Sequence, residues 1–334
     1  MSAPAERADR VLRDTDVFAA AAELSRLNSE HAHHSHRHSA SRTLNLIVLA
    51  PGPSGDEREL RAGLALLGAH HPARTLVLRR QAADRLDAAL RITCSVCADA
   101  RAAGACSEEV LLTADAGRLE HAGSLVAPLL AKDLPTVLWL PAADGLKDAR
   151  LALTGLLDHV VLSSEEVGLA RASELAEGDA PVHDIEWGGL ERWRTQVAAA
   201  FESAGRREMI GRIDRVTVSG ESGIAGVLLA GWLAGRLGWT VERLDAAEGG
   251  GLEGEGRRAD GTIGRVRVQN GPMDRSVLLA ADAEEVRVRA PAEAHAEASF
   301  VEAINPGPGF AAGYDAALRA LAPALGRFPI GLGG

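Results

Sequence analysis

The sequence predicts an α/β protein in which a layered N-terminal α/β domain with a mostly parallel sheet precedes a smaller α+β domain. Three observations support this prediction. Apolar strand-like runs alternate with helix-like stretches over residues 43–177, which is typical of α/β layers. The first two runs bracket one helix, which implies a parallel crossover. Near the C-terminus three strand-like runs follow one another with no helix between them, which favours an α+β arrangement.

The segment 1–40 is expected to hold a helix followed by a linker. Apolar residues recur at helical spacing over residues 4–28, which predicts an amphipathic helix packed on the main domain, with a partner-binding arm as the alternative. Five imidazoles then lie within His31–His38. Metal sites draw on fixed elements and supporting partners, so this run reads as a solvated linker with incidental metal affinity.

Residues 41–204 are expected to form the α/β domain. Thr43–Ala50 is a continuous apolar run and predicts a buried strand. Glu57–His70 carries leucines on one face and predicts a helix. By the same criteria, further strands are expected at 74–79, 89–96, 109–113, 135–140 and 159–162. Further helices are expected at 117–130, 146–157 and 165–177. A last helix is expected after Gly188–Gly189, with Leu190, Trp193, Val197 and Phe201 on one face.

Residues 205–334 are expected to form the α+β domain, because the composition changes at Ser203–Arg207. A strand, a helix and a strand come first, followed by a Gly-rich acidic loop, three strands and a terminal helix. These elements are predicted at 216–219, 224–237, 240–244, 248–255, 262–268, 276–280, 285–289 and 309–322.

The bulk composition restricts the function. A net charge of −10 argues against a nucleic-acid surface, because phosphate binding needs clustered Lys and Arg. No stretch approaches the roughly 20 apolar residues of a membrane helix. Residues 1–28 are charged throughout and lack a signal-peptide core, so a cytoplasmic location is expected.

The loop Pro51–Gly55 opens onto a predicted helix and offers a weak candidate anion site at Gly52, Ser54 and Gly55. It lacks both the G-x-G-x-x-G spacing and the Gly-Lys ending of a P-loop. A plain turn with a helix cap is the competing interpretation.

Three cysteines form the other candidate site. Cys94 and Cys97 have C-x-x-C spacing, with Cys106 nearby, which allows a redox-sensitive set, a metal site or inert small residues. The pair is predicted at the end of a strand and not at the helix N-terminus of a thioredoxin-type site, and a fourth zinc ligand is missing. A pairing of Cys94 or Cys97 with Cys106 across the connection is geometrically possible.

Catalytic motifs are missing from the sequence. The isolated histidines have no nucleophile at motif spacing, and neither G-x-S-x-G nor H-E-x-x-H occurs. The sequence therefore predicts no catalytic residue, no metal and no cofactor.

Several tryptophan-containing motifs occur in a fixed order: Asp133–Pro141 (DLPTVLWLP), Asp184–Trp187 (DIEW) followed by Trp193-Arg194, and Leu229–Arg236 (LAGWLAGR). Together with His71–Leu78 and Glu109–Leu130 they resemble the glucose-6-phosphate dehydrogenase assembly protein family (OpcA). The chain departs from the family pattern at Leu140, at Gly188-Gly189 and before Ser163-Ser164.

The resemblance implies a non-enzymatic protein of the oxidative pentose phosphate pathway that binds glucose-6-phosphate dehydrogenase and favours its active oligomer. Trp and Arg dominate interface hot spots, so Trp187, Trp193, Arg194 and Trp139 are the candidate partner contacts, with core packing as the alternative for the tryptophans. The resemblance also implies redox control at Cys94, Cys97 and Cys106. The competing function is an enzyme or sensor that binds a sugar phosphate or a nucleotide at the Gly52–Gly55 loop.

Overall fold

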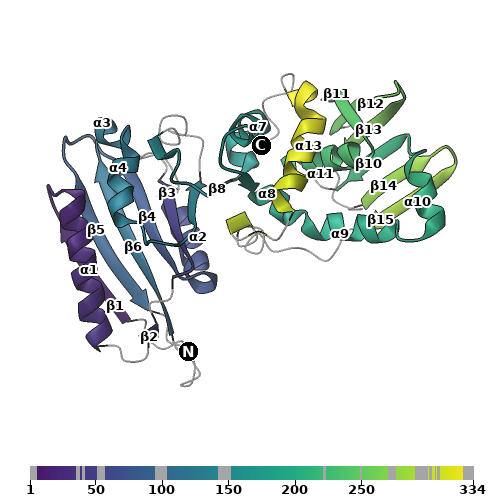
Figure 1. Ribbon diagram of the computed structural model, residues 1–334. Helices are drawn as coiled ribbons and strands as arrows, with labels where there is room; N and C mark the ends of the chain where they lie inside the picture. Colours follow the sequence, from purple (N-terminus) through teal and green to yellow (C-terminus); the bar gives the residue numbers. More distant parts are fainter. Residues whose placement is uncertain are drawn as a thin grey trace. The chain divides into compact units, whose positions relative to one another are not determined.

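The chain forms two compact units, Met1–Leu162 and Ser163–Gly334, in a computed structural model (Figure 1). The structure describes residues 6–34, 38–39, 42–50, 57–94, 104–141, 152–220, 223–248, 250–269, 276–289, 300, 303–304, 306 and 309–325. The predicted loop Pro51–Gly55 and the first half of the predicted helix 146–157 lie outside these residues. Each unit has its own sheet.

The sheet of the first unit is mostly parallel, which confirms the predicted fold class. Its strands run in the order β1-β5-β6-β4-β3-β7-β8, and β2 pairs with β6. The pairs β3–β4, β4–β6, β3–β7 and β7–β8 are parallel, whereas β5 and β1 join one edge antiparallel. The strands are β1 (Glu6–Leu12), β2 (His38–Ser39), β3 (Leu44–Leu49), β4 (Ala73–Arg80), β5 (Asp87–Cys94), β6 (Gly104–Ala114), β7 (Thr136–Leu140) and β8 (His159–Leu162).

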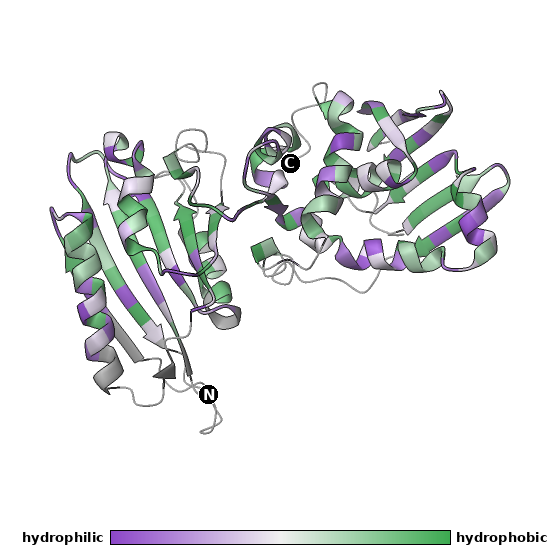
Figure 2. Ribbon diagram, in the orientation of Figure 1, coloured by the Kyte–Doolittle hydropathy of each residue, from purple (hydrophilic) through white to green (hydrophobic). Residues whose placement is uncertain are grey.

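Helices lie on both faces of this sheet. On one face, α1 (Val17–His34) contacts β5 and the 3-10 turn η1 (Ala127–Leu129), whose Leu129 accepts a hydrogen bond from Arg74. On the other face, α2 (Glu57–His70) lies against the Trp139 ring, since a Cβ built on Gly63 would come within 2.5 Å of it. Strands β3 and β7 are accordingly mostly apolar, and Figure 2 shows green segments along the strands of this sheet with purple ones between them.

The prediction of one helix over residues 4–28 is wrong in its first part. Residues Glu6–Leu12 form β1, which pairs antiparallel with β5, and the helix begins at Val17 after Asp16 caps it through the N–H of Ala19. Two apolar residues of the helical pattern lie in solvent, since Val11 is 61% and Phe18 72% exposed. A linker was expected at His31–His38, but the helix continues to His34 and β2 begins at His38. The side chains of residues 31–38 lie outside the described residues.

Two other predicted helices are interrupted. The predicted helix 117–130 consists of α3 (Ala116–Leu119), α4 (Ala122–Val126) and η1. The predicted helix 165–177 is divided by Gly168, whose φ of 82° ends α6 (Ser164–Val167) before α7 (Leu169–Ala176) starts.

The second unit has a mainly antiparallel sheet in the order β11-β12-β13-β10-β14-β15, in which only β10 and β13 are paired in parallel. Helices α11 (Gly223–Arg236) and α13 (Phe310–Leu325) pack against each other and against β11. The strands are β10 (Arg215–Ser219), β11 (Trp239–Ala246), β12 (Leu252–Arg258), β13 (Ile263–Gln269), β14 (Ser276–Ala281) and β15 (Glu284–Arg289). This arrangement agrees with the predicted α+β class.

The predicted Gly-rich loop 248–255 contains most of strand β12. Its glycines serve a close approach between strands: a Cβ on Gly254 would stand 1.7 Å from the backbone oxygen of Arg243. The register of β11 and β12 shifts at this place, between Val241 and Arg243, as it does at a β-bulge.

The division between the units falls at Leu162, whereas the composition change predicted it at 205. Strand β9 (Val182–Asp184) and helices α8 (Ile185–Gly189) and α9 (Glu191–Ala200) contact α13, α11 and β15, which places them in the second unit. Helix α10 (Ala204–Ile210) occupies the predicted boundary. Among the described residues, none of the helices combines the length and apolar character that crossing a bilayer requires.

Candidate functional site

The motif Asp184–Arg194 begins with a buried carboxylate that caps two short helices. Asp184 Oδ1 accepts hydrogen bonds from the backbone N–H groups of Ser164, over 3.1 Å, and Glu186, over 3.0 Å. These are first-turn donors of α6 and α8, which have no partner within their own helices. Burial raises the pKa of Asp184, and the hydrogen bonds from Ser164 oppose that shift.

Trp187 fastens α8 to α13. Its side chain is 1% exposed, and its Nε1–H donates to the Phe310 carbonyl over 3.1 Å. Gly313 makes the approach possible, because a Cβ there would lie 2.9 Å from Trp187 Cζ2. The ring centroid lies 6.1 Å from that of Tyr314, whose pKa is raised well above its ordinary value by burial and by the Asp184 carboxylate.

Arg194 packs against the ring of Trp187. Its Cζ lies 3.9 Å from the ring centroid, and its Nη1 donates to the Trp187 carbonyl over 2.6 Å. The guanidinium therefore combines a cation–π contact with a hydrogen bond to the C-terminal turn of α8. Arg194 is half-buried, so one side of it reaches the surface.

The structure brings Trp187, Trp193 and Arg194 together on α8 and α9 of the second unit, whereas Trp139 lies on β7 of the first. Trp193 is 2% and Trp139 6% exposed. Their assignment as partner contacts stays a prediction. Beside Trp193 the exposed side of α9 carries Glu191, Arg192, Thr195, Gln196 and Ala199.

Glu186 is a functional candidate that sequence reasoning missed. Burial raises the pKa of Glu186 to about 7, and the nearby Asp184 carboxylate adds to the shift. The Ser163 hydroxyl opposes it, because it donates a hydrogen bond to Glu186 Oε1 over 2.6 Å. The position of Glu186 two residues after a helix-capping aspartate was the one signal in the sequence. The contribution of Tyr314, far along the chain, left none.

Cys106 is disulfide-bonded and 5% exposed. The register of β5 and β6 places Cys94 directly opposite it. The side chains of Cys94 and Cys97 lie outside the described residues, and a redox role for the three stays a prediction. Across the described ranges no group of three or more His, Cys, Asp and Glu side chains is placed to hold a metal ion.

Two protein-family models match the chain one after the other. The model described as the glucose-6-phosphate dehydrogenase subunit N-terminal domain matches residues 65–177, and the one described as its C-terminal domain matches residues 180–307.

Curated relatives named OpcA show the same similarity. The protein of Nostoc punctiforme is 34% identical over 142 residues, which cover 40% of this chain and 30% of the relative. That of Synechococcus elongatus is 26% identical over 204 residues, which cover 58% of this chain and 46% of the relative. The chain therefore spans less than half the length of these relatives.

Solved structures of dehydrogenases align over most of the chain at low identity. Glucose-6-phosphate 1-dehydrogenase from Mycobacterium avium is 11% identical with a TM-score of 0.48, covering 84% of this chain and 91% of that one. The WlbA dehydrogenase from Bordetella pertussis is 13% identical with a TM-score of 0.47, covering 86% and 96%. Likeness at this level assigns no function.

Proposed function

Because the chain belongs to the OpcA family of glucose-6-phosphate dehydrogenase subunits, we propose that it binds a glucose-6-phosphate dehydrogenase and favours the active oligomer of that enzyme. The observation that carries the proposal is the order of the two family matches, which together extend almost without interruption over residues 65–307. The relatives' names assign them to the OxPP cycle, and we extend that assignment to this chain.

Such an effect needs no chemistry in the chain itself. A partner that binds the competent state of an enzyme better than its other states shifts the population toward it. At a free concentration 100 times the dissociation constant, the shift is about 2.7 kcal/mol. We propose a non-enzymatic, cytoplasmic activator of this kind.

The contact surface that we propose is the outer side of α9 with Arg194. The exposed positions Glu191, Arg192, Thr195 and Gln196 offer charged and polar groups, and Arg194 supplies a half-buried guanidinium of the type enriched in hot spots. Trp187 and Trp193 would act from beneath by holding α8 and α9 in place, as their burial suggests. Trp139 belongs to a separate candidate contact in the first unit.

The test is the initial rate of the same organism's glucose-6-phosphate dehydrogenase against glucose 6-phosphate, with and without the chain. We expect a lower apparent KM, a higher kcat or a shift to a larger oligomer, read by sedimentation. An unchanged rate and unchanged sedimentation, with the chain well above the enzyme's concentration, would sink the proposal.

The surface is tested by Arg194→Ala, with Arg206→Ala on the exposed α10 as the matched control. We expect Arg194→Ala to raise the concentration of chain needed for half-maximal activation about tenfold or more, which corresponds to a loss of at least about 1.4 kcal/mol and is within the range of hot-spot truncations. Arg206→Ala should leave it within a factor of two. If both variants activate the enzyme equally and their circular dichroism spectra are unchanged, Arg194 is not part of the proposed contact surface.

A further inference from the structure

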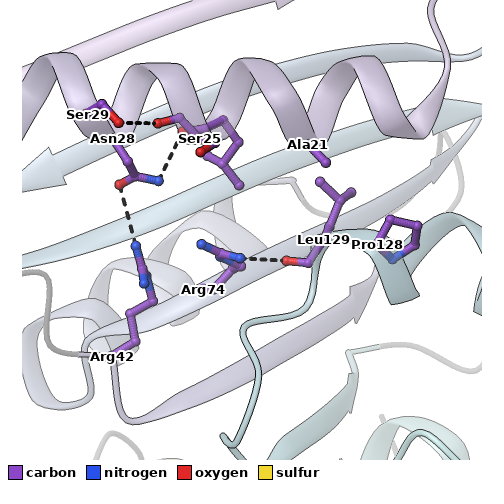
Figure 3. Close-up of a pocket in the computed structure, with 9 residues that line it drawn as sticks. Ala21, Ser25, Asn28, Ser29, Arg42, Arg74, Pro128 and Leu129 are labelled. Atoms are coloured by element: carbon purple, nitrogen blue, oxygen red, sulfur yellow. Dashed lines mark hydrogen bonds between the residues drawn. The ribbon is translucent and has the colours of Figure 1, made fainter.

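A pocket of about 440 Å³ lies in the first unit, between α1 and the sheet (Figure 3). Its walls include Leu24, Ser25 and Asn28 of α1, Leu129 of η1, and two arginines, Arg42 and Arg74. This volume falls within the range of small-molecule sites, which is about 300–1,000 Å³. The mixture of apolar and polar walls is also usual for such sites.

The two arginines share one buried carboxylate. Glu108 on β6 is 2% exposed; its Oε2 accepts from Arg74 Nε over 2.6 Å, and its Oε1 accepts from Arg42 Nη2. Arg42 and Arg74 are themselves only 22% and 14% exposed. Two guanidinium groups against one carboxylate leave a formal charge of +1 at a place where water screens it weakly.

Both guanidiniums keep donors that Glu108 does not use. Each carries five N–H groups in a planar fork. Arg74 Nη1 donates to the Leu129 carbonyl over 2.8 Å, and Arg42 Nη2 also approaches Asn28 Oδ1 at 3.5 Å. Within the described part of the chain, Arg42 Nε is buried with no acceptor. A buried donor without an acceptor is costly, so an incoming anion would remove a penalty as well as gain contacts.

We propose that this pocket binds a small organic phosphate. A phosphate group has three terminal oxygens and carries up to two negative charges near neutral pH, so it can accept the remaining donors of both arginines at once and neutralise their excess charge more fully than a second carboxylate. The hydroxyl of Ser25 and the amide of Asn28 stand beside the arginines for a polar remainder, and Leu24 and Leu129 supply an apolar wall. The pocket belongs to the first unit and the α8–α9 surface to the second, and the proposal does not depend on the proposed function.

Calorimetric titration of the full chain with four probes tests the class of ligand. Glucose 6-phosphate carries one phosphate on a hydroxylated body; glucose is its neutral counterpart, gluconate its carboxylate counterpart, and inorganic phosphate lacks the body. We expect saturable one-to-one binding of glucose 6-phosphate, weaker binding of inorganic phosphate and none of glucose. Absence of saturable binding by both phosphates, or gluconate binding as tightly as glucose 6-phosphate, would overturn the proposal.

Three variants test the location. Arg74→Gln removes one guanidinium, and Ser25→Asp adds a carboxylate at an exposed position of the rim without disturbing the core. We expect each to weaken binding about tenfold, the effect of one unit charge several ångströms away in partly screened surroundings. Ala19→Asp adds the same charge to an exposed position of α1 outside the pocket and should stay within a factor of two. Unchanged binding in Ser25→Asp, or an equal loss in Ala19→Asp, would place the ligand elsewhere.

Discussion

Single residues of this protein owe their properties to partners distant in the chain. Asp184 caps the helix that begins at Ser164 as well as its own, and Trp187 donates to the carbonyl of Phe310. Because Trp187 lies in the core, removing it to test a partner contact would also empty the space it fills, at about 3–5 kcal/mol. Arg194 is the residue of this motif whose truncation tests the partner contact without emptying space in the core.

Glu186 makes the stability of the second unit depend on pH. Its pKa is about 7 in the folded chain against 4.5 for an ordinary glutamate, so the folded state holds a proton that the unfolded state has lost. The free energy of unfolding should therefore fall as pH rises from about 4.5 to 7, by up to about 3.5 kcal/mol, since each pKa unit corresponds to about 1.4 kcal/mol. Urea unfolding at pH 5, 6, 7 and 8 measures it.

Glu186→Gln should flatten this dependence, because an amide stays neutral at every pH. The exposed Glu177→Gln serves as the control and should keep the slope of the wild type. Parallel curves for wild type and Glu186→Gln would mean that Glu186 does not carry the effect.

At the scale of elements, the contact of α11 with α13 depends on a glycine. A Cβ on Gly231 would stand 2.5 Å from Leu321 Cδ1 and 3.1 Å from the Ala317 carbonyl. We expect Gly231→Ala to lower the free energy of unfolding by about 1–3 kcal/mol through overpacking. Gly205→Ala, in α10, has nothing within 4 Å of the new Cβ and should raise stability by up to about 1 kcal/mol. Chemical denaturation of both variants measures these changes. If Gly231→Ala is as stable as the wild type, the two helices can move apart at little cost.

The pairing of β5 with β6 leads to a prediction about thiols. Cys106 is disulfide-bonded, and the chain has three cysteines. Alkylation of the denatured, unreduced protein should therefore modify one cysteine, and alkylation after reduction all three, as read by mass spectrometry. Three modified cysteines without reductant would contradict the disulfide. Repeating the dehydrogenase assay with reductant would then show whether this bond affects activation.

For the whole molecule, activation and binding must be reciprocal. If the chain lowers the dissociation constant of the dehydrogenase for glucose 6-phosphate by some factor, the substrate must tighten binding of the chain to the enzyme by the same factor. We expect substrate to strengthen the complex in a titration of labelled chain with enzyme. The substrate could also bind the chain's own pocket, and Ser25→Asp is the control for this. Because this variant weakens binding in the pocket, it should still show the reciprocal effect that arises at the enzyme. A lower apparent KM without tighter binding of the chain would show that the chain changes a kinetic step and not the dissociation constant for substrate.

The sequence was sufficient where the signal lies between neighbours along the chain. The apolar run Thr43–Ala50 predicted β3, and the leucine spacing of Glu57–His70 predicted α2, because burial on both faces or on one stripe leaves a local pattern. The tryptophan motifs likewise indicated the family, because each motif is a short run of adjacent residues. The fold class followed from the order of such elements.

Tertiary structure decided whatever depends on a distant partner. Residues Glu6–Leu12 are a strand because β5 offers them an edge, and α8 and α9 belong to the second unit because their apolar sides meet α11, α13 and β15. Likewise, Arg42, Arg74 and Glu108 form one charged pocket only because β4 and β6 are adjacent in the sheet. Periodicity records how much of a segment is buried, but the identity of the surface that buries it is set by contacts between segments far apart in the chain.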